Sequence, residues 1–273
     1  MVVFPNCKIN IGLHVIEKRT DGFHNIETIM VPTNWRDVLE IVPEENKEAE
    51  TEFKCTGIRL FGPKEKNLCL RAYNLLSEKY MLPPVKMHLH KIIPIGAGLG
   101  GGSTDAAHTL MALDQVFKLN LSEKELHGFS EMLGSDCAFF INNKTTYATG
   151  RGEILEPLKI KLKNIFCVIV KPRIHINTAN AYSLIKPKKR KESLQQLIQE
   201  PIQKWKDLIE NDFEKVVFET NPGIKNIKTR LYKLGATYAS MTGSGSAVYG
   251  LFTEEKHLDT YFRSSTVWSG SIG

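Results

Sequence analysis

Cysteines and long apolar runs are scarce in this sequence, and each scarcity argues against a class of protein. The five cysteines are odd in number, and no two of them are spaced as C-x-x-C. This usage is typical of reduced thiols and argues against a disulfide framework or a zinc site. The apolar run at 165–170 is far too short to span a membrane, and polar residues at 6, 8 and 10 interrupt any signal-peptide core. We therefore expect a cytoplasmic protein with no membrane partner.

The net positive charge is modest, and no aromatic residues lie in its one basic cluster, so the sequence does not indicate a nucleic-acid binder. The formal net charge is +6, and part of it lies in one cluster at 186–191 that contains no aromatic residue. Single-stranded nucleic acids bind basic grooves with interleaved aromatic rings, so we interpret this cluster as a solvated loop and expect no nucleic-acid partner. The chain has 273 residues, of which 42% are hydrophobic, enough for one large or two ordinary globular domains.

Glycine, by contrast, is concentrated in one place. Five glycines lie within the seven residues 96–102. Alternating apolar residues predict a strand over 85–90 before this stretch, and helical periodicity predicts a helix over 106–117 after it, with Ser103 or Thr104 as its N-cap. Glycine permits positive φ and close backbone approach, and a helix start offers unpaired N–H groups. The stretch is therefore predicted to bind phosphate, although a tight turn would show the same composition.

The kind of phosphate site is not settled by this loop alone. Gly96, Gly98 and Gly101 satisfy G-x-G-x-x-G. The dinucleotide fold, however, needs a second parallel strand that ends in an acidic residue, and a helix at 122–133 follows instead. Gly102 occupies the position that a Walker loop gives to lysine. A dinucleotide-binding oxidoreductase thus stays the weaker alternative. A phosphate loop without its own lysine needs a cation from elsewhere in the chain.

Two charged residues are candidates for this missing chemistry. Residues 7–15 alternate as a strand, with Lys8 and Asn10 side by side on the face away from the core. Lys8 is either a solvated lysine or the cation that the loop needs. Asp136 is the only ionisable residue in a small and apolar segment at 134–140, where it is either a helix cap or an active-site group. Its local setting favours the cap.

The remaining elements are predicted from periodicity and from turn and capping residues. Asp21-Gly22 predicts a hairpin turn, and packing in that turn is the simpler interpretation of Phe23 and His24. Ser122 and Glu125 are spaced as a capping box. Further helices are expected at 67–80, after Asn177-Thr178, at 194–209 and at 224–234, strands at 38–42, 145–148, 165–170, 236–241 and 247–252, and a solvated acidic loop at 44–52.

Three motifs occur in order along the chain: Lys8-Ile9-Asn10, the glycine stretch at 94–107 and a Gly/Ser loop at 241–247. By itself the last is either a long hairpin or an anion-binding turn. Together with Asp21-Gly22-Phe23-His24 and the segment 134–140, these motifs make the chain resemble the GHMP kinase superfamily of small-molecule kinases. The resemblance extends over nearly the whole chain.

The resemblance implies a fold and a reaction. The fold is a two-domain α+β architecture, with an N-terminal ribosomal-S5-domain-2-like catalytic half at 1–155, a C-terminal ferredoxin-like half at 156–273, and the substrates between the halves. The reaction is ATP-dependent phosphorylation of the 2-hydroxyl of a cytidine diphosphate-linked methylerythritol in non-mevalonate isoprenoid synthesis, with Mg²⁺ accompanying the nucleotide. We expect a small-molecule substrate and a monomer or weak homodimer. A mevalonate-type or amino-alcohol kinase is the alternative within this fold, and the stretch 21–24 argues against it.

The resemblance also implies a role for each matching residue. Lys8 and Asp136 would be the catalytic pair, and no metal ligand is assigned. Two departures from the family pattern are Phe23, where tyrosine is commoner, and Cys137-Ala138, where Val-Pro is usual. The ATP site would comprise Asn67, Pro94, Ile95, Gly96, Ala97, Gly98, Leu99, Gly100, Gly101, Gly102, Ser103 and Thr104, with Thr242, Gly243, Ser244 and Gly245 as the third glycine motif. The substrate site would comprise Asn10, Phe23, His24, Thr178 and Tyr182, with His24 and Tyr182 on the cytosine.

Overall fold

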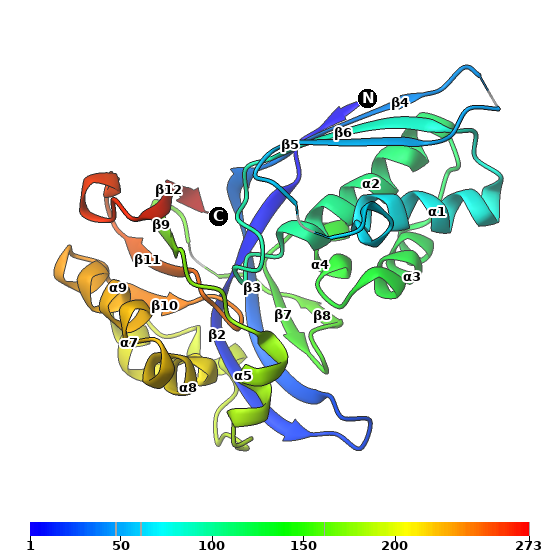
Figure 1. The fold of residues 1–273 in the computed structure, drawn as a ribbon. Coiled ribbons are helices and arrows are strands. Elements are labelled where there is room, and N and C mark those ends of the chain that lie inside the picture. Colours follow the sequence, from blue (N-terminus) through cyan, green and yellow to red (C-terminus); the bar gives the residue numbers. More distant parts are fainter. Residues whose placement is uncertain (47, 61, 161, 273) are drawn as a thin grey trace. The chain divides into compact units, whose positions relative to one another are not determined.

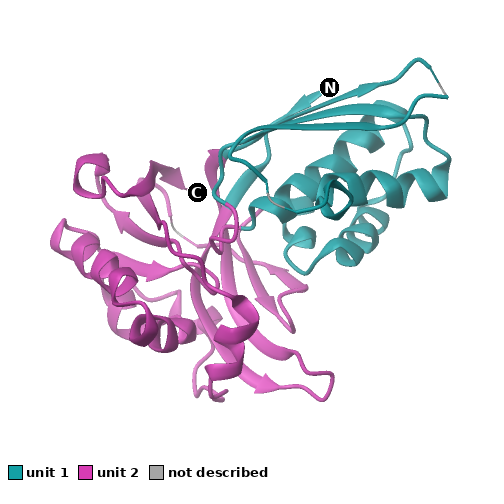
Figure 2. Cartoon of the chain, in the orientation of Figure 1, with its two compact units in different colours: residues 1–7, 36–94, 100–143 teal, residues 8–35, 95–99, 144–273 magenta. Residues whose placement is uncertain are grey.

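The computed structural model describes residues 1–46, 48–60, 62–160 and 162–272. They form two compact units that interleave along the chain (Figures 1 and 2). Unit 1 comprises residues 1–7, 36–94 and 100–143, and unit 2 comprises residues 8–35, 95–99 and 144–273. The chain therefore passes from unit 1 into unit 2 and back within the glycine stretch. The predicted domain boundary between residues 155 and 156 stays a prediction. The two units are defined by contacts within the chain, whereas that boundary separates the two domains that the family resemblance implies.

Unit 1 is a four-stranded sheet with helices packed on one face (Figure 1). Inward-facing residues alternate along its strands, as at 39 and 41 and at 85, 87 and 89, and pack on apolar residues of the helices. In sheet order the strands are β1 (Val2–Val3), β4 (Val38–Pro43), β6 (Val85–Lys91) and β5 (Glu52–Gly57), antiparallel except for the parallel pair β5 and β6. The helices are η1 (Lys64–Lys66), α1 (Leu68–Tyr80), α2 (Gly101–Phe117), α3 (Glu123–Leu133) and α4 (Cys137–Asn142).

Unit 2 is built on an eight-stranded sheet whose apolar residues pack on α5, α8 and α9. The strands run in the order β10 (Tyr238–Met241), β11 (Val248–Phe252), β9 (Ile165–Pro172), β12 (Ser265–Ile272), β3 (His24–Arg36), β7 (Thr146–Thr149) and β8 (Ile154–Pro157), and β2 (Asn6–Lys18) pairs with β3. The helices are α5 (Thr178–Leu184), α6 (Leu194–Leu197), η2 (Ile202–Lys204), α7 (Trp205–Leu208), α8 (Asp212–Thr220), α9 (Pro222–Lys233) and η3 (Asp259–Tyr261). The ends of β2 and β3, residues 6–7 and 36, belong to unit 1.

Most of the predicted elements are confirmed, with shifts of a few residues at their ends. The helix expected at 67–80 is α1, whose N-cap Asn67 accepts a hydrogen bond from the Cys69 backbone N–H at 2.8 Å. The capping box of Ser122 and Glu125 is present at the start of α3. The five cysteines are free thiols. No helix within the described ranges combines the length and apolar character that a bilayer crossing requires.

Three predictions about elements were wrong or incomplete. The N-cap of α2 is Gly100, with a left-handed φ of 70°, and not Ser103 or Thr104. The helix therefore starts inside the glycine stretch, and both hydroxyl residues lie within its first turns. The helix expected at 194–209 is divided into α6, η2 and α7, because Pro201 cannot continue a helical hydrogen-bond ladder. Strands β1, β5, β8 and β12 and helix α8 were not predicted from the sequence.

Candidate active site

Lys8 and Asn10 lie on β2 in unit 2 and are buried, with 3% and 2% of their surfaces exposed. The prediction that they occupy an exposed face was wrong, because β2 is covered on both faces over residues 6–15. The Lys8 ammonium donates to Asn10 Oδ1 at 2.6 Å. A lysine buried in this way is held in one position, which a solvated lysine is not.

The strand that carries Lys8 lies against the unit 2 portion of the glycine stretch, residues 95–99. The Lys8 backbone N–H donates to the Leu99 carbonyl at 3.0 Å. On the other side of this portion, the Ala247 N–H donates to the Ala97 carbonyl at 3.1 Å, and the Thr242 hydroxyl donates to the Gly98 carbonyl at 2.9 Å. The first and third predicted motifs therefore both contact the glycine stretch within unit 2.

Gly98 is required for this contact by both space and backbone angle. Its φ is +77°, and a Cβ built on it would lie 2.0 Å from the Thr242 carbonyl oxygen. A Cβ on Gly243 would in turn lie 3.1 Å from Gly98 Cα. The two loops thus pack backbone against backbone, which no residue with a side chain permits.

Asn211 supports the third glycine motif and was not predicted from the sequence. Its side-chain amide donates to the carbonyls of Met241 and Gly243 at 2.8 and 2.9 Å, while its Oδ1 accepts from the Phe213 N–H at the start of α8. The signal in the sequence was an asparagine before an acidic helical first turn, which is typical of an N-cap. The N-cap and the loop are therefore held by one buried side chain.

In unit 1, the glycine stretch forms the first turn of α2. A Cβ on Gly101 would lie 3.0 Å from Ile93 Cγ2 and 3.1 Å from Lys91 Nζ, so this glycine faces the interior. On Gly102 the nearest atom would be Leu68 Cδ1 at an ordinary 3.5 Å. Thr104, predicted to bind ATP, is buried, and its hydroxyl lies 3.2 Å from His108 Nδ1. The unpaired N–H groups at this helix start are the part of the stretch suited to an anion.

A second buried lysine lies beneath this turn. Lys91 Nζ donates to Asp37 Oδ2 at 2.5 Å, to Asp105 Oδ2 at 2.6 Å and to the Gly101 carbonyl at 3.1 Å. Burial raises the pKa of the Asp105 carboxyl to about 8, although the adjacent Lys91 opposes that shift. Burial alone would lower the pKa of Lys91, but the neighbouring carboxylates raise it above its ordinary value. The cluster fixes β6 to the first turn of α2.

Asp136 precedes α4 in unit 1. It occupies the N-cap position, but its φ and ψ of −76° and −13° are helical, and its side chain makes no capping hydrogen bond. The capping role that the local sequence favours is therefore wrong. Lys8 belongs to unit 2 and Asp136 to unit 1, so their pairing as catalytic residues stays a proposal.

The two residues predicted to bind the cytosine, His24 and Tyr182, lie together in unit 2. The rings of His24 and Tyr182 stack with their centroids 5.0 Å apart and their planes 19° apart, and Tyr182 also packs edge-on against Phe213 at 4.8 Å. Burial lowers the pKa of His24, which favours the neutral imidazole. Phe23 is more than half exposed and lies under the Arg151 guanidinium at 5.0 Å. Residues from the two expected halves of the chain thus meet at this aromatic pair.

The remaining predicted contacts divide between the units. Thr178, at the start of α5, has its hydroxyl 2.8 Å from that of Ser244, which joins one predicted substrate residue to the third glycine motif. Asn67 lies in unit 1 and caps α1, so its side-chain oxygen already has a role in the fold. Within the described residues, no three His, Cys, Asp or Glu side chains gather as metal ligands would.

Comparison with known families defines the class of protein. Residues 67–144 match the GHMP kinases N terminal domain, and residues 193–261 match the GHMP kinases C terminal domain. The fold agrees, since the structure superposes on a mevalonate kinase with a TM-score of 0.72 at 17% identity over 100% of this chain and 99% of the other. That likeness concerns the fold alone.

More similar proteins narrow the class to one enzyme. A 4-diphosphocytidyl-2-C-methyl-D-erythritol kinase of Bacteroides fragilis is 46% identical over 258 residues, 94% of each chain. That of Parabacteroides distasonis is 44% identical over 274 residues, 100% of both chains. A crystal structure of 4-(cytidine 5'-diphospho)-2C-methyl-D-erythritol kinase superposes with a TM-score of 0.82 at 29% identity, covering 100% of this chain and 99% of the other. The chain belongs to the 4-diphosphocytidyl-2-C-methyl-D-erythritol kinase family of the GHMP kinases.

Proposed function

We propose that the protein transfers the γ-phosphoryl group of ATP to the 2-hydroxyl of 4-diphosphocytidyl-2-C-methyl-D-erythritol, a step of non-mevalonate isoprenoid synthesis. The observation that carries this proposal is a buried ammonium, Lys8, on a strand hydrogen-bonded to the glycine stretch at Leu99. It occurs in a chain 46% identical to such a kinase. The glycine stretch has no lysine of its own, and Lys8 supplies the cation.

The chemistry assigns separate tasks to the predicted residues. Phosphoryl transfer needs an acceptor oxygen in line with the γ-phosphorus and cations or N–H groups around the charge that develops. The N–H groups at the start of α2 bind the phosphates, and Lys8 orients the hydroxyl and balances charge. Asp136 accepts the hydroxyl proton.

Changing Asp136 to asparagine keeps its shape and removes the base, so it should lower kcat by roughly 10²- to 10⁴-fold. A variant that kept most of the rate would return Asp136 to a structural role.

Magnesium fits this site as an ion that enters with the nucleotide. Mg²⁺ commonly binds substrate phosphates and water with only one or two protein carboxylates. The described residues offer no cluster of three or more acidic, histidine or cysteine ligands. The phosphate oxygens would therefore be its principal ligands, and the ion would neutralise charge on the β- and γ-phosphates.

The aromatic pair is the proposed cytosine site. His24 and Tyr182 already stack on each other at 5.0 Å, so the base adds to the stack on an outer face or separates the two rings. A neutral imidazole offers one N–H and one lone pair to the edge of the base. Tyr182→Leu keeps the apolar contact with Phe213 but removes the aromatic face. It should raise KM for the cytidyl substrate about tenfold, because stacking is worth about 1–3 kcal/mol per base. KM for ATP should be unchanged.

A coupled assay of ADP formation tests the whole proposal. The purified chain is given ATP and Mg²⁺ with the cytidyl substrate, with mevalonate or with homoserine. We expect turnover with the cytidyl substrate alone. Faster turnover with mevalonate would replace this proposal by the alternative kinase of the same fold. Oligomeric state and a cytoplasmic location stay predictions from the sequence.

A further inference from the structure

Asn10 has all four of its polar groups engaged within unit 2. Its backbone N–H donates to the Thr242 hydroxyl at 3.1 Å, and its carbonyl accepts from the Tyr249 hydroxyl at 2.8 Å. Its side-chain Oδ1 accepts from Lys8 Nζ at 2.6 Å, and its Nδ2 donates to Thr28 Oγ1 at 3.0 Å. The Asn10 side chain therefore holds Lys8 and Thr28 in position relative to each other.

Thr28, on the adjacent strand β3, decides which way the Asn10 amide faces. It is fully buried, and its hydroxyl donates its single hydrogen to the Gly12 carbonyl at 2.6 Å. Because that hydrogen is committed, Thr28 Oγ1 can only accept a hydrogen bond from Asn10. The amide nitrogen must therefore face Thr28, and the amide oxygen must face the opposite way.

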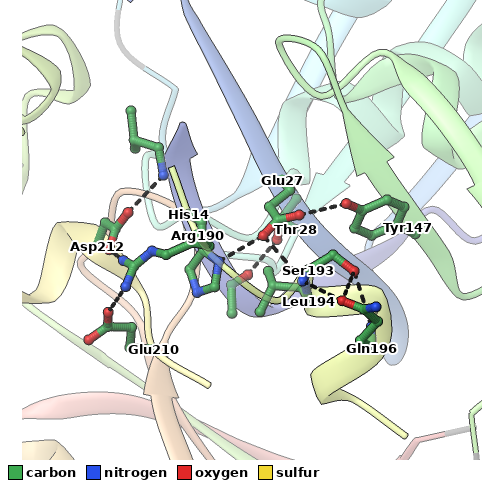
Figure 3. A network of polar contacts seen from close by, with 12 residues as sticks. His14, Glu27, Thr28, Tyr147, Arg190, Ser193, Leu194, Gln196, Glu210 and Asp212 are labelled. Carbon is green, nitrogen blue, oxygen red and sulfur yellow. Dashed lines mark hydrogen bonds and ion pairs between the residues drawn. The ribbon is translucent and has the colours of Figure 1, made fainter. Parts of the chain in front are cut away.

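The opposite side of the amide is occupied by Lys8. An ammonium carries donors and no acceptor, so it needs the amide oxygen. The two requirements agree, and a reversed amide would leave donor facing donor at Lys8 and acceptor facing acceptor at Thr28. Neighbouring contacts hold Thr28 in turn, since the adjacent Glu27 accepts from Tyr147 at 2.6 Å and lies 2.8 Å from His14 Nδ1 (Figure 3).

We propose that Thr28 is a positioning residue of the phosphoryl transfer, which acts on Lys8 through the Asn10 amide. Thr28 belongs to none of the sequence motifs, and its role rests on the proposed function only in taking Lys8 as a catalytic residue. Without the Thr28 hydroxyl, Asn10 Nδ2 loses its acceptor, and the amide is held only at its oxygen, by Lys8 and by the Thr242 hydroxyl at 3.2 Å. The amide then shifts to find another acceptor, and the Lys8 ammonium moves with it away from the reacting groups, while nucleotide binding is untouched.

The test compares two threonines that make the same bond. Thr28→Val keeps shape and removes the hydroxyl. Thr146→Val is the matched control, because Thr146 is buried in the same sheet and its hydroxyl also donates to a backbone carbonyl, that of Lys144, at 2.6 Å. We expect Thr28→Val to lower kcat roughly 10- to 100-fold, the range for a buried partner left unpaired, with KM for ATP unchanged. Thr146→Val should keep the wild-type kcat.

A second pair of variants tests the proposal even if Thr28→Val does not fold. Thr28→Ser and Thr28→Ala differ only by the hydroxyl oxygen, and we expect serine to restore most of kcat and alanine not to. Equal kcat in this pair, or wild-type kcat in folded Thr28→Val, would overturn the proposal, because the hydroxyl would then be irrelevant.

A spectroscopic reading separates this inference from the proposed function. With asparagine labelled in its side-chain nitrogen, the Asn10 amide signal is assigned by its loss in Asn10→Asp. We expect it to move in Thr28→Ala and to stay in Thr28→Ser. An unmoved signal in Thr28→Ala contradicts the inference, whatever substrate the enzyme takes. A wild type that does not turn over the cytidyl substrate contradicts the proposed function alone, and the amide signal then decides the inference.

Discussion

The two lysines that are buried within the described ranges, Lys8 and Lys91, have different neighbours. Lys91, in unit 1, donates to the carboxylates of Asp37 and Asp105, whereas Lys8, in unit 2, donates to the neutral amide oxygen of Asn10. The acidic partners of Lys91 oppose its charge, while the Asn10 amide orients the Lys8 ammonium and adds no charge of its own. Lys91 is thus built to join β6 to α2, and the Asn10 contact suits a cation that must act on a phosphate.

The comparison is tested most directly by removing the Lys8 charge. Lys8→Met keeps much of the apolar stem and loses the ammonium. We expect kcat to fall by roughly 10²- to 10⁴-fold, because charge on the transferring phosphoryl group is no longer balanced. Asn10 Oδ1 loses its hydrogen bond from the ammonium and keeps the Thr242 hydroxyl at 3.2 Å, so we expect a cost in stability of about 1.5–3 kcal/mol, that of one hydrogen bond to a charged group. Steady-state kinetics and urea unfolding measure the two effects, and a variant with near wild-type kcat would show that Lys8 is only structural.

Lys91→Met should reverse this pattern. It leaves Asp37 and Asp105 buried without their cation, and breaking such a pair costs about 3–5 kcal/mol. We expect the urea midpoint to fall sharply, while kcat of the remaining folded protein changes much less than in Lys8→Met. Adding Asp37→Asn to Lys91→Met should recover part of the lost stability, because it removes an uncompensated buried carboxylate while the asparagine oxygen can still accept from the backbone N–H groups of Ile92 and Ile93. A stable Lys91→Met variant would contradict the structural role.

The glycines above Lys91 sharpen the comparison between fold and function. A side chain on Gly101 meets Ile93 and Lys91, whereas one on Gly102 meets only Leu68 at contact distance. Gly101→Val should therefore lower stability, by about 1–3 kcal/mol for overpacking. Gly102→Val should keep stability near that of a glycine-to-valine change in any helix but weaken ATP binding, because its Cβ enters the space that phosphate needs. Calorimetry with ATP checks both, and equal nucleotide affinity in the wild type and Gly102→Val would contradict phosphate binding at this turn.

Features of the Lys8 and Lys91 regions that depend on local sequence patterns were predicted better than features that depend on contacts between distant segments. The strands and helices with clear periodicity and the capping box of α3 follow from local spacings, and they were predicted correctly, whereas the short strands β1 and β8 and the strands β5 and β12 were missed. The burial of Lys8 was missed because alternation shows which residues share a face, but not whether a second layer covers that face. Lys91 continues the alternation of the inward-facing residues 85, 87 and 89, so the sequence did indicate that its side chain is buried. Its partners Asp37 and Asp105 are far away in sequence.

The site residues show the same division. The motifs of the glycine stretch and of residues 8–10 were recognisable as sequence, and so was the hairpin before His24. The roles of Thr28 and Asn211 depend on hydrogen bonds between distant segments, which no local spacing encodes. The N-cap of α2 was placed wrongly because serine and threonine are strong caps, while Gly100 is the cap and Gly101 and Gly102 already belong to the first turn.

The last expected effect concerns the pH dependence of the Lys91 cluster. The Asp105 carboxyl has an ordinary pKa of 3.8 and a pKa of about 8 in the folded protein, because burial disfavours its charge. Between these values the folded state holds a proton that the unfolded state has lost. The unfolded state then binds fewer protons, so this group's contribution to stability is full below about pH 4 and declines as the pH rises to about 8. Asp105→Asn cannot titrate and removes the decline.

The measurement is the free energy of unfolding of the wild type minus that of Asp105→Asn, taken in urea at several pH values. We expect this difference to fall as the pH rises from about 5 to about 7, by at most about 1.4 kcal/mol per unit for one proton, and to level off above about 8. Lys91 stays protonated over this range, since its pKa is raised above its ordinary 10.5, so it does not add to the slope. A difference that stays flat or rises with pH would mean that Asp105 is ionised beside Lys91. The cluster would then carry a net negative charge beneath the turn that we propose binds phosphate, whereas Lys8 is proposed to supply positive charge to the same reaction.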